Sequence, residues 1–295
     1  MDKSIKEQLR EPGTLSPAGP GSSVTGELIL HEFPSRRFRN RRMLRVWLPP
    51  GYHDPENSGR RYPVFYLNDG QNLFDRATAF GGVEWRVDET ADFLIRQGEV
   101  PPLIIVGIDN AQNDRMKEYL PYRSFNPTIL RPQGKDYPDF LMQEIMPFVG
   151  ERYRVAPGPE NTGLGGSSMG ALIALYTAVD RPAVFGRLLL ESPSLFIAHR
   201  RMLKYSRYFR EWPERIFLAI GTGESDREDK NRQFVDDVRD LVGVLARAGL
   251  DERRLRVRIE AGAPHSEAAW AARFPEALRF LFGAAQMEAD PARAG

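Results

Sequence analysis

Residues 162–176, TGLGGSSMGALIALY, place two adjacent serines between glycines and in front of an apolar helical run. The pattern Gly-x-Ser-x-Gly fits in one register only, in which Gly166 and Gly170 flank Ser168; for Ser167 the second position would be Met169. This pattern is typical of a sharp strand-to-helix turn, where small residues admit close backbone and a strained serine exposes its hydroxyl. We therefore interpret the stretch as strand, turn and helix, with Ser168 as the candidate nucleophile.

Strand and helix patterns alternate on both sides of this turn. Short apolar runs predict buried strands, and apolar residues three or four positions apart predict helices. The further predicted strands are 62–69, 102–109, 186–193, 215–223 and, as an outer strand, 254–262. The predicted helices are 84–98, 136–153, 169–180, 230–249 and 266–283. Such alternation predicts an α/β fold with a mostly parallel central sheet and helices on both faces.

The N-terminal part differs from this pattern. ELILHEF (27–33) and MLRVWLP (43–49) favour strands and are separated by a basic, turn-like segment, which predicts an antiparallel pair at the start of the sheet. Residues 1–25 are rich in Pro, Gly and Ser without an apolar period, so we predict a flexible tail there and a second tail over 285–295. The sequence thus predicts one domain, residues 26–284.

Two irregular segments, 110–135 and 194–214, interrupt the alternation. In open α/β sheets such segments lie near the carboxyl ends of the strands, where ligands bind.

Composition excludes several classes of site. The chain has 295 residues, a net charge of +1 and no cysteine, so disulfides, thiolate metal sites and cysteine nucleophiles are excluded. The near-zero charge does not favour nucleic acid or an anionic membrane as a partner. No apolar run has the length of a signal peptide or a spanning helix, which favours a cytoplasmic protein.

A serine hydroxyl needs a general base, and the chain has four histidines. In proteins with this kind of turn, the triad residues follow one another along the chain in the order serine, acid, histidine. The base must then follow Ser168, and His199 and His265 are the two histidines that do. His265 lies in AGAPHSEAAW, between the last predicted strand and the last helix, and is the predicted base. His199 lies in a basic, aromatic segment, and His31 and His53 precede the serine, so we interpret these three as structural or surface residues.

The third member of the triad is expected in the loop after the strand at 215–223. GTGESDREDKN offers several carboxylates, of which Glu224 is nearest the strand and is preferred; Asp226 is the alternative. A carboxylate in this role orients the imidazole and stabilises its protonated form.

A tetrahedral intermediate formed by attack of the serine needs two N–H donors. One is expected from Met169, directly after the nucleophile. The other is expected from DGQNLFD, after the strand at 62–69, with the Gln71 N–H as donor and Gly70 admitting close backbone. A simple tight turn is the alternative for this segment.

Several segments resemble one known family. VWLPPGY (46–52), YLNDGQNLFD (66–75), GLGGSSMGALIALY (163–176) and GAPHSEAAW (262–270) are similar to the α/β-hydrolase esterases of the esterase D, feruloyl esterase and enterochelin esterase types. EWRVDETAD (84–92) and VGIDNAQNDRMKEYLPYR (106–123) also resemble this family. The resemblance implies an α/β-hydrolase fold and a serine esterase without a cofactor, with Ser168, His265 and Glu224 as its triad. Enterochelin esterases of the larger type carry an additional N-terminal domain, for which 25 residues are too few.

The substrate is less well defined by the sequence. Trp85, Tyr119, Tyr122 and Arg123 lie next to strand ends and are candidate substrate contacts, with packing or surface positions as the alternative. No histidine pair has the spacing of metal ligands, so no metal is expected. We expect a small-molecule ester as substrate and leave a homodimer open as the assembly. Acyl transfer, hydrolysis of a siderophore trilactone and a non-catalytic binding protein remain as alternative functions.

Overall fold

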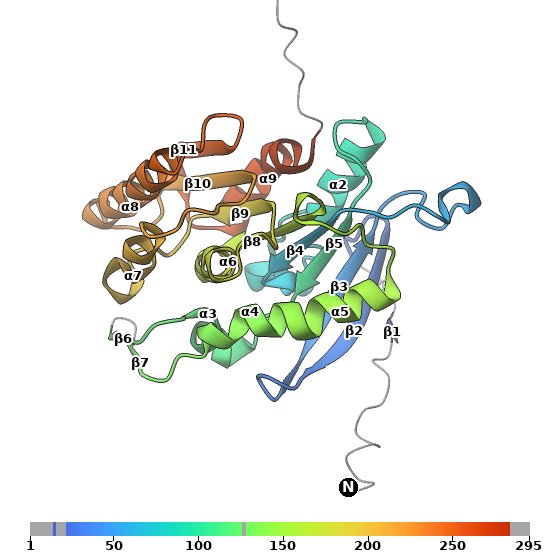
Figure 1. Cartoon of the computed structure of the whole chain (residues 1–295), viewed down its shortest axis with the longest axis horizontal. Helices are drawn as coiled ribbons and strands as arrows, with labels where there is room; N and C mark the ends of the chain where they lie inside the picture. Colours follow the sequence, from blue (N-terminus) through green and yellow to red (C-terminus); the bar gives the residue numbers. More distant parts are fainter. Residues whose placement is uncertain (1–13, 16–21, 126–127, 284–295) are drawn as a thin grey trace, which may run out of the picture.

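The computed structural model describes residues 14–15, 22–125 and 128–283, and the core of the described chain is a nine-stranded sheet (Figure 1). The strand order is β1-β2-β3-β5-β4-β8-β9-β10-β11. β1 (Thr14–Leu15), β2 (Glu27–Ser35) and β3 (Asn40–Leu48) are antiparallel, and β3 pairs antiparallel with β5. All later pairs are parallel. The predicted fold class, including the antiparallel N-terminal pair, is confirmed.

The parallel part of the sheet in the described chain consists of six strands, of which the central ones are short and buried. Their bounds are β4 (Val64–Asn68), β5 (Ile104–Ile108), β8 (Thr162–Ser167), β9 (Arg187–Glu191), β10 (Arg215–Gly223) and β11 (Leu255–Pro264). Every residue of β4, β5 and β8 is buried, because helices cover both faces there. β11 is the edge strand and is mostly exposed, as its alternating charged residues predict.

Two apolar clusters fill the space between sheet and helices. On one face lie α4 (Tyr137–Phe140), α5 (Met146–Arg152), α6 (Met169–Asp180), α7 (Ile197–Ser206) and α8 (Glu228–Arg247). On the other face lie α2 (Val87–Arg96) and α9 (Glu267–Phe282). Figure 1 shows α9 and α2 above the sheet and α6 below its centre. α6 is buried along almost its whole length, which agrees with its continuous apolar sequence.

Two segments differ from the prediction. The helix predicted over 136–153 is interrupted by a π-helical turn at Leu141–Ile145, directly before Pro147 in the first turn of α5. Proline has no N–H to donate within the helix, which accounts for the irregular turn. The segment 194–214, predicted as irregular, contains α7, whose apolar residues are too few among its basic ones to produce a clear helical pattern.

The smaller elements lie at strand ends. They are η1 (Pro55–Asn57), η2 (Gly70–Asn72), η3 (Phe80–Gly82), η4 (Gln112–Asp114), α3 (Arg115–Tyr119), the hairpin β6 (Ser124–Phe125) and β7 (Thr128–Ile129), η5 (Gly134–Asp136) and η7 (Pro159–Asn161). Of these, η2 and α3 are part of the candidate site.

The predicted N-terminal tail is held to the domain where it is described. Thr14–Leu15 pairs with β2, Ser22 Oγ donates a hydrogen bond to Asp75 (2.9 Å), and the Thr25 N–H donates one to Asp88. The rest of this tail and the predicted tail at 285–295 lie outside the described residues. No helix in the described part of the chain combines the length and apolar character that crossing a membrane requires.

Candidate active site

Ser168 occupies a strained turn between β8 and α6. Its backbone has φ 55° and ψ −121°, a conformation that side-chain-bearing residues rarely adopt and that costs about 1–3 kcal/mol. Two backbone hydrogen bonds hold it there: the Ser168 N–H donates to Glu191 O (2.8 Å), and the Ser194 N–H donates to Ser168 O (3.2 Å). Ser167, by contrast, is a buried residue of β8.

The two glycines of the motif are required by close packing. A Cβ on Gly166 would lie 2.9 Å from the Gly170 carbonyl carbon and 3.1 Å from the Asn68 Cβ. A Cβ on Gly170 would lie 2.8 Å from an Asp69 carboxylate oxygen. The turn that carries Ser168 is thus pressed against the carboxyl end of β4, and the Asn68 side-chain amide donates a hydrogen bond to Gly170 O (2.8 Å).

The hydroxyl of Ser168 is not bonded to the predicted base. Its hydrogen-bond partner is the Ser194 hydroxyl, with 3.3 Å between the two oxygens. Among the described residues, His265 makes no hydrogen bond with Ser168. In ligand-free hydrolases this contact is often long and tightens only when substrate binds.

Glu224 and His265 form a direct pair. His265 Nδ1 contacts Glu224 Oε2, while Oε1 accepts hydrogen bonds from the Ser192 hydroxyl (2.7 Å) and the Gly221 N–H (2.8 Å). Burial alone would raise the pKa of Glu224, but the hydrogen bonds from His265, Ser192 and Gly221 outweigh it and lower that pKa below its ordinary value. An ionised Glu224 favours a proton on Nδ1, which leaves Nε2 of the ring as the basic nitrogen.

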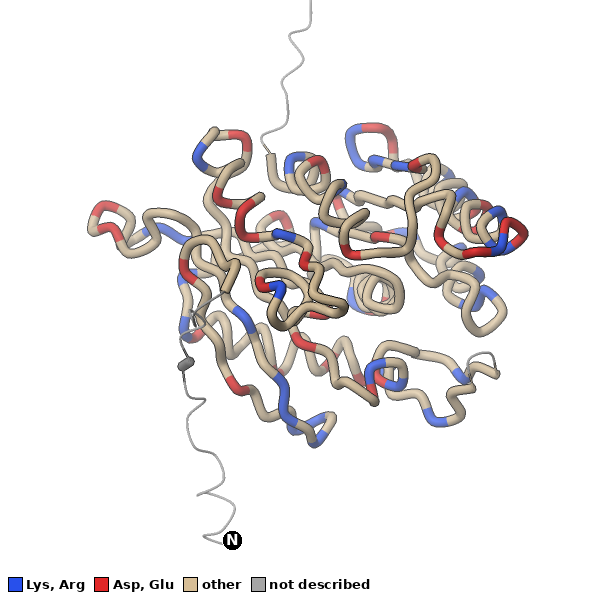
Figure 2. Tube along the Cα trace, turned by 180° about the vertical axis from the view of Figure 1, so that it is seen from behind, with Lys and Arg blue, Asp and Glu red and all other residues tan. Residues whose placement is uncertain are grey.

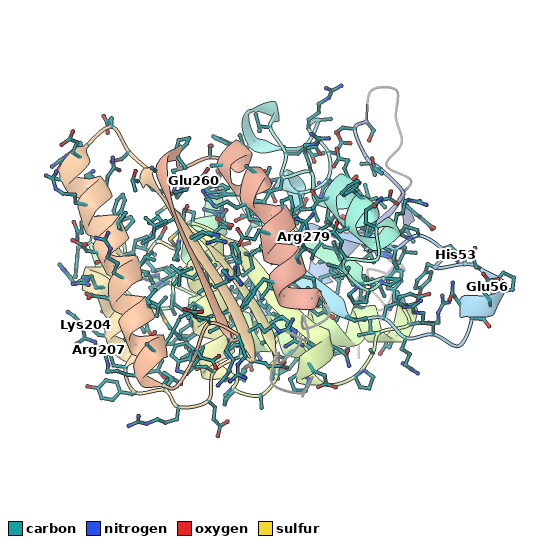
Figure 3. All side chains as sticks on the ribbon, turned by 90° about the horizontal axis from the view of Figure 1, so that it is seen from above. His53, Glu56, Lys204, Arg207, Glu260 and Arg279 are labelled. Carbon is teal, nitrogen blue, oxygen red and sulfur yellow. The ribbon has the colours of Figure 1, made fainter. Side chains whose placement is uncertain are left out.

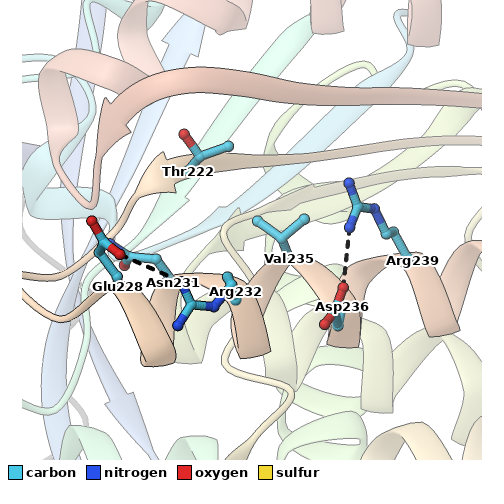
Figure 4. A pocket seen from close by; sticks show the side chains of 7 residues that line it. All are labelled: Thr222, Glu228, Asn231, Arg232, Val235, Asp236 and Arg239. Carbon is cyan, nitrogen blue, oxygen red and sulfur yellow. Dashed lines mark hydrogen bonds and ion pairs between the residues drawn. The ribbon is translucent and has the colours of Figure 1, made fainter.

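Asp226, the alternative acid, is exposed in the same loop, and among the described residues the carboxylate that pairs with His265 is that of Glu224. The loop is pinned from its other side by Asn231, whose side chain bonds both the N–H and the carbonyl of Ser225 (2.8 and 2.9 Å). Beyond Asn231, a groove of about 500 Å³ runs along α8 (Figure 4). Two ion pairs within α8 occupy the charges of this groove, and no candidate catalytic residue lines it.

Two backbone amides are free at the expected oxyanion positions. Met169 is the first residue of α6 and Gln71 the second of η2, so neither N–H has an acceptor within its own helix. Neither is bonded to another acceptor in the described part of the chain. Gly70 was expected to admit close backbone at the oxyanion position. In the structure the backbone close to it is that of β5, because a Cβ on Gly70 would lie 2.5 Å from the Gly107 carbonyl carbon.

A charged network that the sequence did not predict supports this oxyanion loop. Asp69 has φ 60°, and its carboxylate accepts two hydrogen bonds from Arg115 (both 2.7 Å) and one from the Asn110 side chain (2.7 Å). Burial alone would lower the pKa of Arg115, but the neighbouring Asp69 raises it well above its usual range. A bidentate pair of this kind holds the turn before Gln71 in one geometry. The sequence held one sign of this network: Asp69 is a charged residue directly after the buried strand β4.

The loop of the candidate base and the candidate oxyanion loop are in direct contact. The Asn72 side-chain amide donates a hydrogen bond to Glu267 Oε1 (3.3 Å), which joins η2 to the start of α9. His265 lies two residues before Glu267. Ser168, its candidate donors and the Glu224–His265 pair therefore lie along one edge of the sheet.

The predicted substrate contacts divide into two groups. Trp85 and Tyr119 are 2% and 0% exposed, so they belong to the supporting core: Trp85 packs against Trp270, and the Tyr119 hydroxyl accepts from the Asp69 N–H (3.4 Å). Tyr122 is half-buried and Arg123 is exposed. Tyr122 packs against Tyr176 in the last part of α6, away from its N-terminus.

The other histidines lie elsewhere. His31 is buried, and its Nε2 lies 2.6 Å from the Tyr153 hydroxyl oxygen. His53 is exposed, and its Nε2 lies 3.0 Å from Glu27 Oε2. Figure 3 shows His53 and Glu56 at one end of the molecule and Lys204 and Arg207 at the other. No group of three or more His, Asp and Glu side chains within the described ranges is arranged to hold a metal ion.

The basic runs of the sequence do not form a continuous positive face. Arg200, in the run 199–212, pairs with Asp237 of α8 (2.8 Å), and Arg42, in the run 36–42, pairs with Glu118 (2.8 Å). Acidic and basic positions are spread over the whole chain trace, with consecutive basic positions at the turn between β2 and β3 (Figure 2).

Comparison with known proteins agrees with this architecture. A family model described as "Putative esterase" matches residues 35–281. The Bacillus subtilis (strain 168) protein named "Uncharacterized protein YbbA" is 25% identical over 265 residues, which are 88% of this chain and 98% of that protein.

Two solved structures share the fold. The siderophore hydrolase EstB from Aspergillus nidulans is 18% identical with a TM-score of 0.68, over 91% of this chain and 98% of that one. The enterobactin esterase FES from Shigella flexneri, with 2,3-dihydroxy-N-benzoyl-glycine present, is 20% identical with a TM-score of 0.67, over 90% of this chain and 62% of that one. At these identities the likeness shows the fold alone. The match over residues 35–281 shows that the chain belongs to the "Putative esterase" family, whose α/β-hydrolase fold it has.

Proposed function

We propose that the protein is a serine carboxylic-ester hydrolase that works through an acyl-enzyme on Ser168. The observation that carries the proposal is the shared edge of the sheet. It brings together a strained serine at a helix N-terminus, two free backbone amides and a carboxylate–histidine pair. A protein that only binds a ligand has no need of this combination.

In the first half of the reaction, the Ser168 oxygen attacks the ester carbonyl carbon while His265 Nε2 takes the hydroxyl proton. The Met169 and Gln71 N–H groups, together with the N-terminus of α6, stabilise the negative oxygen of the tetrahedral intermediate. Collapse of the intermediate breaks the ester C–O bond, and the leaving alcohol takes the proton from His265. Water then attacks the acyl-enzyme by the same route and releases the carboxylic acid. Glu224 holds the imidazole in the required tautomer and stabilises its protonated form.

Attack requires Ser168 to exchange partners, since its hydroxyl is bonded to Ser194 in the free protein. Rotation about one side-chain bond redirects the oxygen, and the backbone conformation of the turn stays as it is.

The test is hydrolysis of p-nitrophenyl acetate and butyrate together with labelling by a fluorophosphonate probe. We expect the wild-type protein to hydrolyse at least one ester and to be labelled. Ser168→Ala should lose labelling and at least about 10³-fold of kcat, because the nucleophile is removed. Ser167→Ala is the matched control and should keep both, since Ser167 lies in β8. A wild-type protein that is inactive on esters and unlabelled contradicts the proposal and leaves a binding role.

The acyl and alcohol groups of the substrate are a second question. Two structures with this fold are named as a siderophore hydrolase and an enterobactin esterase, which makes a catecholate trilactone a candidate substrate beside simple esters. Comparing kcat/KM for such a trilactone with that for p-nitrophenyl butyrate decides between them. Acyl transfer to an added alcohol, measured as a new ester product, tests whether water is the only acceptor.

A further inference from the structure

The segment at the end of β9, Glu191-Ser192-Pro193-Ser194, contacts both the Ser168 turn and Glu224 of the candidate site. The Glu191 carbonyl accepts the Ser168 N–H, and the Ser194 hydroxyl is the partner of the Ser168 hydroxyl. Between them, Ser192 donates a hydrogen bond to Glu224 and accepts one from the Trp270 indole N–H (3.0 Å). Sequence reasoning gave no role to any of these residues.

Ser192 closes a cycle of contacts that joins four side chains: those of His265, Glu224, Ser192 and Trp270. His265 Nδ1 contacts one oxygen of Glu224, and Ser192 donates to the other oxygen (2.7 Å). Trp270 donates to Ser192, and its indole packs edge-on against the His265 ring, with 5.0 Å between centroids and an angle of 87°. The imidazole is therefore restrained at its Nδ1 edge by the carboxylate and beside its ring by the indole. Of the Glu224–His265 pair, the histidine faces the solvent: its side chain is 36% exposed, whereas that of Glu224 is only 2% exposed.

The backbone of Ser192 indicates that its hydroxyl is needed. Ser192 has φ 44°, in the left-handed region where glycine is the favoured residue, and it is only 3% exposed. A side chain at this φ costs about 1–2 kcal/mol relative to glycine. The Ser192 N–H donates to Ala219 O (2.7 Å), so the strained backbone is also fixed to β10. Strain that persists at a buried position next to a catalytic group is a sign that the side chain has a function.

We propose that Ser192 and Trp270 are positioning residues that act on His265 through Glu224 and through ring packing. This inference rests on the proposed esterase function and deepens it. The Ser192 hydroxyl fixes the rotation of the Glu224 carboxylate, so that Oε2 stays aimed at Nδ1 while Oε1 is held. Trp270 fixes Ser192 and limits the tilt of the imidazole. Neither residue touches the ester.

Positioning of this kind has a defined kinetic signature. Loss of the Ser192 hydroxyl lowers kcat, because proton transfer by a misaligned imidazole is slower. KM stays within about twofold, because no substrate contact is removed. A hydrogen bond to an ionised carboxylate is worth roughly tenfold or more in rate when the aligned state depends on it.

The test compares Ser192→Ala with Ser192→Gly. Both variants lose the hydroxyl, but only glycine relieves the strain at φ 44°. We expect both to lose about tenfold or more of kcat on a p-nitrophenyl ester, with fluorophosphonate labelling slowed to match. Ser192→Gly should nevertheless have the higher Tm of the two. If Ser192 had only a structural role, the more stable variant would also be the more active one. We expect instead that the two variants differ in Tm and are equally impaired in kcat.

Two further variants complete the design. Trp270→Phe keeps a ring beside His265 and removes the indole N–H, so kcat should fall by about threefold to tenfold with KM unchanged. Ser206→Ala is the matched control, because Ser206 is also a buried serine, and within the described ranges its hydroxyl bonds only Met202 O in α7 (2.9 Å). It should keep the wild-type kcat.

Two results overturn the inference. One is a wild-type kcat in Ser192→Ala, and the other is a kcat in Ser192→Gly that recovers together with its Tm. If the wild-type protein is labelled and active, either result overturns this inference alone. An inactive, unlabelled wild type overturns the proposed function and this inference with it.

Discussion

The centre of the sheet and its margin contribute to the candidate site in different ways. At the centre, the turns after β4 and β8 consist of small or strained residues, and a Cβ on Gly166 or Gly170 would clash with the neighbouring chain. At the margin, β10 and β11 carry Glu224 and His265, and the histidine side chain is 36% exposed. The centre fixes the candidate nucleophile, Ser168, through backbone packing, whereas the margin fixes the candidate base, His265, through side-chain hydrogen bonds. Substitutions at the centre should therefore affect folding and activity together, and those at the margin activity alone.

The largest effect on rate is expected at the margin. Glu224→Gln should lose about 10³-fold or more of kcat, because the amide cannot hold the imidazole in the required tautomer or stabilise its positive charge. Asp226→Asn is the matched control, because Asp226 lies in the same loop but is exposed. Steady-state kinetics on p-nitrophenyl butyrate measure both. Equal losses in the two variants would contradict the assignment of Glu224 as the acid.

At the centre, Gly166→Ala should lower the free energy of unfolding by about 2–3 kcal/mol, since the new methyl group meets the Gly170 backbone at 2.9 Å. Activity should fall with it, by roughly 10²-fold, as the Ser168 turn is displaced. Gly150→Ala is the control, because nothing lies within 4 Å of the Cβ that would be added there in α5. Urea denaturation measures both variants. If Gly166→Ala loses activity at full stability, the centre behaves like the margin and the distinction fails.

The smallest effect is expected where the two regions join, at Glu191. Burial raises the pKa of Glu191 to about 7, although Arg273 acts against this shift. The folded protein then holds a proton that the unfolded chain releases near pH 4.5, so this residue's contribution to stability falls as the pH rises from about 4.5 through 7. Glu191→Gln removes that dependence. Its free energy of unfolding relative to wild type should increase by on the order of 1–2 kcal/mol between pH 5 and pH 8.

Denaturation of both proteins at pH 5, 6.5 and 8 measures this difference. A constant difference across these pH values would show that Glu191 is ionised throughout, held by Arg273 (2.9 Å). Glu191 would then resemble the margin, where side-chain hydrogen bonds to an ionised carboxylate hold the structure.

The sequence predicted the fold and the positions of Ser168, Glu224 and His265 through local patterns and their order along the chain. Strand-helix alternation fixes which residues end strands, and parallel strands bring those ends to one edge. The supporting contacts have no such local signal. Ser192 and Trp270 are 78 positions apart, and Asp69 and Arg115 are 46 apart. Each pair depends on side-chain directions that only the packed structure defines.

The same limit explains the buried positions of Trp85 and Tyr119. Both follow the rule that residues near strand ends face the site, yet both rings pack into the layer beneath it. An aromatic residue near a strand end buries a large apolar area whichever way its side chain turns. Its position in the sequence therefore does not distinguish a substrate contact from a core residue beneath the site.

The place of α9 has a consequence for the order in which a ribosome makes this protein. His265 and Trp270 are translated after every strand residue up to Pro264, although Trp270 and Phe274 pack against Trp85 in the first third of the chain. A nascent chain that ends at Pro264 already carries Ser168, both candidate amides and Glu224. It lacks the proposed base and α9, which together with α2 covers one apolar face of the sheet. The proposed base and much of the cover of that face are therefore completed together and late, so a chain that stops at Pro264 should be inactive in the proposed reaction and should expose apolar surface.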